Sequence, residues 1–209
     1  MRAILHWRFV KLTGIFVEYT RFIPYKDFRL IYTKRKEEGD FMTEVTIRIL
    51  NESDLKVISE AFHNQGWEKP ETLFRKYWIE QEKEQRVTLV AEMNGDFAGY
   101  VNVLWQSDYP YFKKRLIPEI QDFNVLIKYR RLGVGTLLMD KAEDIVRERS
   151  EVSGLGVGLF SDYGAAQALY VNRGYVPDGK GIFKHGEYLQ YSQQVIVDDD
   201  LNLFLVKRL

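Results

Sequence analysis

The chain contains no cysteine among its 209 residues. Disulfides, thiolate metal sites and a cysteine nucleophile are therefore excluded. Its three histidines, His6, His63 and His185, are far apart in the sequence and lack the spacing of a ligand set. We expect no metal centre.

The sequence also lacks an excess of charge of either sign. It has 30 basic and 30 acidic residues, so it has no general attraction for nucleic acid. No apolar run approaches the roughly 20 residues needed to span a bilayer. The first residues lack the continuous apolar region and cleavage site of a secretory signal. We expect a cytoplasmic protein that binds neither nucleic acid nor membranes.

Residues 1–41 differ from the rest of the chain because they are rich in aromatic and basic residues without a sustained period. One interpretation is a cationic aromatic arm that binds a membrane surface or a partner. The other is a segment upstream of a mis-assigned start, because Lys36–Gly39 can be encoded by a purine run that resembles a bacterial ribosome-binding site before Met42. We favour the second and predict an extension at 1–41 and one domain at 42–209.

Periodicity predicts the order of the elements from Thr43 onwards. Val45–Ile49 alternates as a strand, and a helix with Leu55, Ile58 and Phe62 on one face follows it. The turn Asn94-Gly95-Asp96 predicts a hairpin. The other expected helices cover 70–79, 137–146 and 165–172, the other strands 86–92, 97–105, 120–127, 154–160, 175–176 and 201–206, and an aromatic loop 107–112. This order predicts an α/β fold, an α+β sandwich around a mixed sheet.

The segment Arg130–Gly135 lies between a predicted strand and a predicted helix. Its glycines let a backbone approach a ligand closely, and the first N–H groups of a helix are unpaired and partly positive. Arg130 and Arg131 add two cations, so the turn predicts a diphosphate site. A Walker loop would need a lysine before Thr136, and a dinucleotide fingerprint would need a third glycine and a downstream acid. Neither is present in the required place.

The pattern Arg-x-x-Gly-x-Gly after an apolar strand resembles the acyl-CoA loop of the GNAT superfamily of N-acyltransferases. Residues 163–175 resemble a second motif of that family, Asn-x-x-Ala-x-x-Leu-Tyr-x-x-x-Gly-Phe, which Ala166, Leu169, Tyr170 and Gly174 match. Tyr163 stands where the family usually has asparagine. The resemblance covers residues 43–209 and implies the GNAT fold, a mixed and mostly antiparallel central sheet flanked by helices.

The resemblance implies acetyl-CoA as co-substrate and assigns residues to it. Backbone groups of Val125 and Ile127 would bind the acyl-CoA arm, and Asp162 or the Tyr163 hydroxyl would replace the hydrogen bond of the missing asparagine. Tyr170 corresponds to the tyrosine that protonates the departing thiolate, although it could equally be a core aromatic. The expected CoA residues are Val125, Ile127, Arg130, Arg131, Leu132, Gly133, Val134, Gly135, Thr136 and Tyr163.

Two carboxylates are candidates for the base that deprotonates the acceptor amine. Glu119 lies where some GNAT enzymes carry a catalytic glutamate, and Asp122 is an acid inside an otherwise apolar strand, where a charge is usually paired or used. The alternatives are a solvated strand edge for Glu119 and a structural salt bridge for Asp122. We assign the acceptor pocket to Trp67, Trp105, Ser107 and Tyr109, although aromatic residues are more often part of a core.

The sequence thus predicts an N-acetyltransferase that moves an acetyl group from acetyl-CoA to a primary amine by direct attack. We expect the amine to belong to a small molecule. The alternatives are acetylation of a protein N-terminus or lysine, and a non-catalytic acyl-CoA-binding module. Because GNAT proteins often dimerise, a homodimer is a further expectation.

Overall fold

The computed structural model of the protein describes residues 10–12, 15–19, 29–34 and 43–209. The chain forms two compact units. Unit 1 consists of Met1–Asn102 and Asp122–Ala142, and unit 2 of Val103–Gln121 and Glu143–Leu209.

Three elements contribute residues to both units, because the chain passes from one unit to the other inside them. They are β6 (Asp96–Leu104), β7 (Glu119–Val125) and α4 (Val134–Arg147). Each unit is described by itself below.

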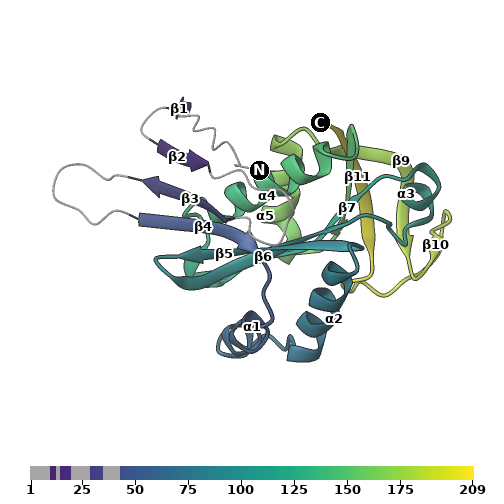
Figure 1. The fold of residues 1–209 in the computed structure, drawn as a ribbon. Coiled ribbons are helices and arrows are strands. Elements are labelled where there is room, and N and C mark those ends of the chain that lie inside the picture. The colour runs from purple at the N-terminus through teal and green to yellow at the C-terminus, as the bar shows by residue number, and fades with distance from the viewer. Residues whose placement is uncertain (1–9, 13–14, 20–28, 35–42) are drawn as a thin grey trace. The chain divides into compact units, whose positions relative to one another are not determined.

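Unit 1 is a sheet with helices packed against it. Helices α1 and α2 lie on one face of the strands β4, β5 and β6 (Figure 1). The elements that belong wholly to unit 1 are β1 (Val10–Leu12), β2 (Ile15–Tyr19), β3 (Arg29–Lys34), β4 (Thr43–Ile49), α1 (Asp54–His63), α2 (Glu71–Glu82), β5 (Arg86–Met93) and the short 3₁₀ turn η2 (Ile127–Tyr129).

The hairpin between β5 and β6 confirms the expected turn. Asn94 and Gly95 both have positive φ, 53° and 88°, as a two-residue turn of the type that matches strand twist requires. Strand β4 pairs antiparallel with β5 from Val45 opposite Met93 to Ile49 opposite Leu89.

The predicted extension at 1–41 contains strands that the sequence did not predict. β3 pairs antiparallel with β4, from Arg29 opposite Arg48 to Lys34 opposite Thr43. The rest of that segment, apart from β1 and β2, lies outside the described residues. Whether residues 1–41 belong to the natural product stays a prediction.

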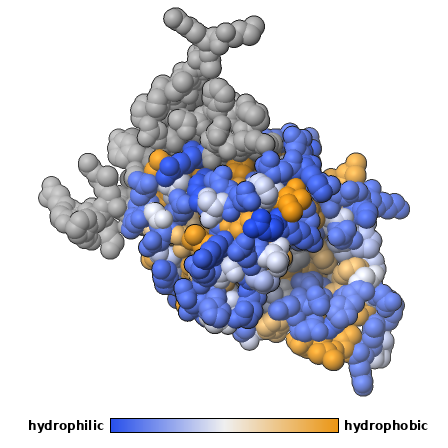
Figure 2. Space-filling view, turned by 60° about the horizontal axis from the view of Figure 1, so that its bottom comes forward, coloured by the Kyte–Doolittle hydropathy of each residue, from blue (hydrophilic) through white to orange (hydrophobic). Residues whose placement is uncertain are grey.

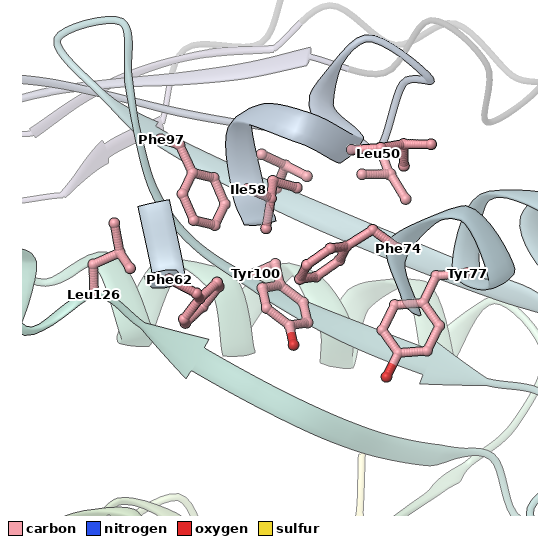
Figure 3. Close-up of a cluster of buried hydrophobic side chains, with 10 residues drawn as sticks. Leu50, Ile58, Phe62, Phe74, Tyr77, Phe97, Tyr100 and Leu126 are labelled. Carbon is pink, nitrogen blue, oxygen red and sulfur yellow. The ribbon is translucent and has the colours of Figure 1, made fainter. Parts of the chain in front are cut away.

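The core of unit 1 is a cluster of aromatic and aliphatic side chains between α1, α2 and the sheet (Figure 3). Phe62 and Phe74 each meet the Tyr100 ring edge to face, at centroid distances of 5.7 and 5.4 Å. The phenol oxygens of Tyr77 and Tyr100 point to the same side in Figure 3. They are the polar ends of side chains whose rings are buried, so they need partners there.

Unit 2 is built on strands from the C-terminal half of the chain. Their order is β8-β11-β9-β10, and the start of β7 runs parallel to β8, with Glu119 opposite Gly154. The elements that belong wholly to unit 2 are α3 (Pro110–Arg115), β8 (Val152–Gly158), the 3₁₀ turn η3 (Ser161–Tyr163), α5 (Gly164–Asn172), β9 (Val176–Lys184), β10 (Glu187–Tyr188) and β11 (Asn202–Arg208).

Three local predictions were wrong. The expected loop at 107–112 contains the first half of α3, because Pro110 can open a helix at its first position while Phe112 is buried in the core of unit 2. The strand predicted through Ile127 ends at Val125, and Ile127 begins the 3₁₀ turn. The strand predicted to end at 160 ends at Gly158.

The fold class itself is confirmed. The sheet is mixed and mostly antiparallel, with the parallel pair β7 and β8 as the exception among the described registers, and helices flank it. The described part of the face in Figure 2 is mostly hydrophilic, with small separate hydrophobic groups. Among the described residues, no helix is long and apolar enough to cross a bilayer.

Candidate active site

The segment Arg130–Gly135 forms the turn that leads into α4 in unit 1. Arg131 and Gly133 have left-handed backbone angles, with φ of 60° and 91°. The helix begins at Val134, and its first ladder bond runs from the Leu137 N–H to the Gly133 carbonyl at 3.1 Å. The N–H groups before Leu137 therefore precede the ladder, and the first turn of α4 has no acidic residue. This end of α4 is suited to an anion.

The two glycines of the turn are needed for different reasons. An added Cβ at Gly133 would have nothing within 4 Å, so its positive φ is what favours glycine. At Gly135, an added Cβ would lie 3.0 Å from the Phe123 ring. The Phe123 ring therefore also favours glycine at Gly135, and the role of both glycines in binding a ligand stays a prediction.

The arginines of the turn leave their charged ends accessible. The Arg130 Nε donates to the Val125 carbonyl at 3.2 Å, and its guanidinium lies 5.3 Å from the centre of the Trp67 ring. No described residue bonds the terminal nitrogens of Arg130 or the guanidinium of Arg131. Leu132 and Thr136 are exposed and Val134 is buried. Arg130 and Arg131, which are always positively charged, therefore directly precede the N-terminal end of α4.

Trp67 is part of unit 1, where its ring stacks on Phe62 at 6.0 Å and lies under Arg130. It was predicted to line an acceptor pocket. Its contacts in this unit are with the aromatic core and with an arginine of the turn, and the acceptor-pocket role stays a prediction. Such a ring orients the guanidinium by cation–π attraction.

The backbone positions assigned to the acyl-CoA arm are partly engaged. The Ile127 N–H donates to the Gln65 Oε1 at 3.1 Å, and its side chain is exposed. The Val125 carbonyl accepts from Arg130 and, as a carbonyl, can accept a second bond. Of the two positions, Val125 is therefore the one on β7 with a backbone carbonyl that can accept a further hydrogen bond.

Asp122 lies in unit 1 at a left-handed backbone position, with φ of 48°. Its Oδ1 accepts from the Lys69 ammonium and the Asn124 amide, both at 2.8 Å. Its Oδ2 accepts from the hydroxyls of Tyr77 at 2.8 Å and Tyr100 at 2.5 Å. Burial alone would raise the pKa of Asp122, but the charge of Lys69 and these hydrogen bonds hold it below its usual value. The carboxylate is stabilised in its charged form and fully bonded.

Glu119 borders a cavity of about 340 Å³ in unit 2. Its Oε2 accepts from the Ser107 hydroxyl at 2.5 Å. Ser107 is completely buried, and its Oγ in turn accepts from the Tyr109 N–H at 3.0 Å. Because that N–H occupies one side of the oxygen, the serine proton points to Glu119. The cavity is lined by Leu104, Asp108, Tyr109, Pro110, Glu119, Gln121, Phe183, Gly186 and Phe204.

Of the other residues predicted for the acceptor pocket in this unit, Tyr109 lines the cavity and Trp105 and Ser107 do not. Ser107 lies behind Glu119, and the Trp105 ring is covered by the Arg149 guanidinium at 4.2 Å. The sequence missed Phe183, Phe204 and Gln121. These residues lie in β9, β11 and β7, which only the folded chain brings to one cavity, so no local signal could have found them.

Tyr170 lies on α5 in unit 2 and is only 7% exposed. Its ring meets the Tyr175 ring edge to face at 6.1 Å. Burial, with a smaller contribution from the negative charge that Tyr163 can carry, raises the pKa of Tyr170 well above its usual value. Within the described part of the chain, its hydroxyl has no hydrogen-bond partner. Tyr170 is thus a phenol that stays protonated and has its proton available.

Tyr163, the residue at the family's asparagine position, is engaged within unit 2. Its hydroxyl bonds the Asp199 carboxylate at 3.1 Å. Its ring fills the space over Gly158, where an added Cβ would come within 2.5 Å of it. The side chain therefore has a packing role there.

One group of metal-ligand type occurs among the described residues. Ligand atoms of His185, Asp198 and Asp200 lie within 4.8 Å of one another. His185 bonds Asp200 at 2.9 Å, and the Lys184 ammonium bonds Asp198 at 2.6 Å. Asp198 already has a lysine partner and Asp200 has His185, so the group is explained by its contacts with protein side chains.

The sequence model of the acetyltransferase (GNAT) family matches residues 53–175, more than half of the chain. The chain belongs to the GNAT acetyltransferase family. This GNAT protein is an acetyltransferase of a family that uses acetyl-CoA. No curated protein matches it in sequence.

Solved structures share the fold of this GNAT protein. A ribosomal-protein-alanine N-acetyltransferase from Brucella melitensis is 20% identical, with a TM-score of 0.58 over 78% of this chain and 99% of that one. The ribosomal-protein-S18-alanine N-acetyltransferase from Escherichia coli is 17% identical, with a TM-score of 0.57 over 78% and 93%. A protein from Salmonella typhimurium described as an acetyltransferase, solved with its cofactor acetyl-CoA, is 20% identical, with a TM-score of 0.55 over 78% and 93%.

A second, larger cavity lies in unit 1, with a volume of about 630 Å³. α1 supplies Val57 and Ala61 to it, and the chain before the arginine turn supplies Leu126 to Lys128. Asp96 is the one acidic residue among the described residues that line it. It contains neither of the carboxylates considered as a base.

Proposed function

We propose that this GNAT protein transfers an acetyl group from acetyl-CoA to the primary amine of a small molecule. The observation that carries the proposal is the Glu119 carboxylate, held by the buried Ser107 hydroxyl at the wall of a cavity of about 340 Å³. That volume lies at the small end of the range of ligand sites. The predicted cytoplasmic location and homodimer stay predictions.

The donor residues follow from the turn in unit 1. Arg130, Arg131 and the free N–H groups at the start of α4 suit the diphosphate of CoA by charge and by donor geometry. The Val125 backbone is the position for the acyl arm. When bound, acetyl-CoA supplies an acetyl thioester.

The chemistry needs a base because an alkyl ammonium with a pKa near 10.4 is about one part in a thousand free amine at neutral pH. Glu119 takes the proton of the ammonium, directly or through a water. The amine nitrogen then forms the bond to the acetyl carbon and loses its second proton to solvent, and the carbon–sulfur bond breaks. Tyr170 gives its proton to the departing thiolate and regains one from solvent, so the products are the amide and the free thiol.

We propose Glu119 rather than Asp122 as the base. Asp122 holds four hydrogen bonds and an ion pair with Lys69, which favour its charged form and leave no free lone pair toward an acceptor. Glu119 has the Ser107 hydroxyl on one oxygen and borders a cavity. A base must reach the proton that it removes.

Steady-state release of thiol from acetyl-CoA over a panel of amines tests the proposal. Glu119→Gln should lower kcat/KM about a hundredfold or more and abolish the acidic limb of its pH profile. Ser107→Ala should lower kcat/KM about tenfold, since it removes one hydrogen bond to a charged group. Asp122→Asn should leave the shape of the profile intact. If Asp122→Asn removed the acidic limb and Glu119→Gln did not, the roles of the two acids would be reversed.

The panel should also contain peptides with a free N-terminus, because two of the similar structures are named as ribosomal-protein N-acetyltransferases. Turnover of peptides alone would overturn the small-molecule acceptor. Tight binding of acetyl-CoA without turnover of any amine would favour the non-catalytic alternative.

A further inference from the structure

The cavity of unit 2 has one wall of aromatic rings. Tyr109 and Phe204 stack face to face, with centroids 3.6 Å apart and planes 3° from parallel. Phe183 meets both rings edge to face, at 4.9 and 5.7 Å. All three residues line the cavity, together with the apolar Leu104 and Pro110.

This wall is rigid before any ligand arrives. The Tyr109 hydroxyl donates to the Asp178 carboxylate at 2.6 Å. Burial, followed by that hydrogen bond, raises the pKa of Tyr109 far above its usual value, so the phenol stays a donor. Tyr109 is 3% exposed and Phe204 is 8% exposed, so both rings are held by their neighbours. A flat ring of a ligand can pack edge to face or offset-stacked against such rings.

The charged groups among the described residues that line the cavity are the acids Glu119 and Asp108, and none of these lining residues is a lysine, arginine or histidine. Lys113 lies outside the lining and pairs with Asp108 at 4.0 Å, where both side chains are exposed. Lys184 bonds Asp198 at 2.6 Å.

These charges distinguish between classes of amine. An ammonium group is attracted to Glu119 and Asp108, whereas a carboxylate on the acceptor would lie beside these acids and meet no cation among the described lining residues. An amino acid carries such a carboxylate next to its amine. A monoamine with a flat apolar body does not, and its body matches the aromatic wall.

We propose that the acceptor is an aromatic primary amine without a carboxylate, bound with its ring on the Tyr109–Phe183–Phe204 wall and its amine toward Glu119. This inference rests on the proposed function, since it identifies the class of the small-molecule acceptor.

The test uses the full chain, acetyl-CoA and four amines. 2-Phenylethylamine has the ring and no carboxylate, phenylalanine adds only the carboxylate, putrescine lacks the ring, and a short peptide starting with alanine represents a protein acceptor. We expect kcat/KM for phenylethylamine to exceed that for phenylalanine about a hundredfold and that for putrescine about tenfold.

Two variants connect the preference to the cavity. Phe183→Leu should reduce kcat/KM for phenylethylamine about tenfold, and it should reduce the ratio of that value to kcat/KM for putrescine about fivefold. Asp108→Lys places a cation at a fully exposed rim position, where folding is not at risk. It should reduce the ratio of kcat/KM for phenylethylamine to kcat/KM for phenylalanine at least fivefold, because the new lysine attracts the carboxylate of phenylalanine.

The outcomes distinguish a wrong acceptor class from a wrong proposed function. If phenylalanine or putrescine equals phenylethylamine in the wild type, the acceptor class is wrong while small-molecule acetylation stands. If Phe183→Leu affects phenylethylamine and putrescine equally, the ring does not bind at this wall and the assignment is overturned. If none of the three small amines releases thiol, the proposed function falls, and the acceptor class with it.

Discussion

At the scale of single residues, the structure separates groups that the sequence could not rank. Glu119 and Asp122 are three residues apart, yet they have different surroundings. Glu119 accepts from the Ser107 hydroxyl and borders a cavity, whereas Asp122 accepts from an ammonium, an amide and two phenols. Burial with full pairing stabilises a carboxylate as an anion and removes it from proton transfer.

Tyr170→Phe should lower kcat about a hundredfold and leave the KM for acetyl-CoA within threefold, because the phenol acts only as the thiolate departs. The pKa of Tyr170 is raised by burial, so the uncharged acid persists as pH increases. The wild type should therefore keep its kcat through pH 10, where an ordinary tyrosine is half ionised.

The matched control is Tyr191→Phe, which removes the hydroxyl of a fully exposed tyrosine in the same unit and should change neither constant. A Tyr170→Phe enzyme with nearly wild-type kcat would make Tyr170 a core aromatic and nothing more.

At the scale of elements, the start of α4 depends on backbone geometry at one glycine. Gly133 has φ of 91° in open space, so a side chain there is opposed by the backbone and not by a neighbour. Gly133→Ala should raise the KM for acetyl-CoA about tenfold and lower the free energy of unfolding by about 1 kcal/mol. Both are measurable from acetyl-CoA titrations and urea denaturation.

Gly164→Ala is the matched control, because Gly164 also has nothing within 4 Å of an added Cβ but has a helical φ of −54°. It should be neutral or slightly stabilising, with an unchanged KM. Equal effects from the two substitutions would show that the positive φ of Gly133 is not what holds the donor turn.

Element prediction succeeded where the signal was local. The hairpin at Asn94-Gly95, helix α1 with its buried face and helix α5 all appear where periodicity and turn chemistry place them. It failed at 107–112, because Ser107, Tyr109 and Phe112 are buried by contacts with distant strands. An aromatic loop and a short core helix have the same composition.

At the scale of the whole molecule, each unit holds a carboxylate whose pKa is lowered by an ionic network. In unit 1 it is the half-buried Asp122, and in unit 2 it is Glu143, which is 3% exposed and bonds Arg173 at 3.0 Å and Lys207 at 2.7 Å. Burial opposes the charged form of each, but the cationic partners lower the pKa of both carboxyls.

Because both folded pKa values lie below the ordinary 3.8 and 4.5, the stabilisation is complete above pH 5 and is lost as pH falls through and below those values. The free energy of unfolding, measured in urea between pH 3 and 7, should decrease toward acid. Asp122→Asn and Glu143→Gln should each lower it at pH 7 by about 2–3 kcal/mol, since the cations lose their partner, and should flatten its pH dependence.

Glu151→Gln is the control, because Glu151 is 82% exposed in its pair with Arg208 and should change little. A pH dependence equally steep in the wild type and in both buried variants would contradict the role of these networks.

The sequence by itself determined the family and the order of the main elements, and it located the turn before α4 that we propose for the donor, because these depend on hydrophobic period, glycine at special backbone angles and adjacent cations. Only the tertiary structure decided which acid meets a cavity, that Ser107 holds Glu119, that Lys69 neutralises Asp122 and that Phe183 and Phe204 form a wall with Tyr109. The physical reason is that these are contacts between residues far apart in the chain. Their energy depends on burial and partner distance, which folding sets and local pattern does not record.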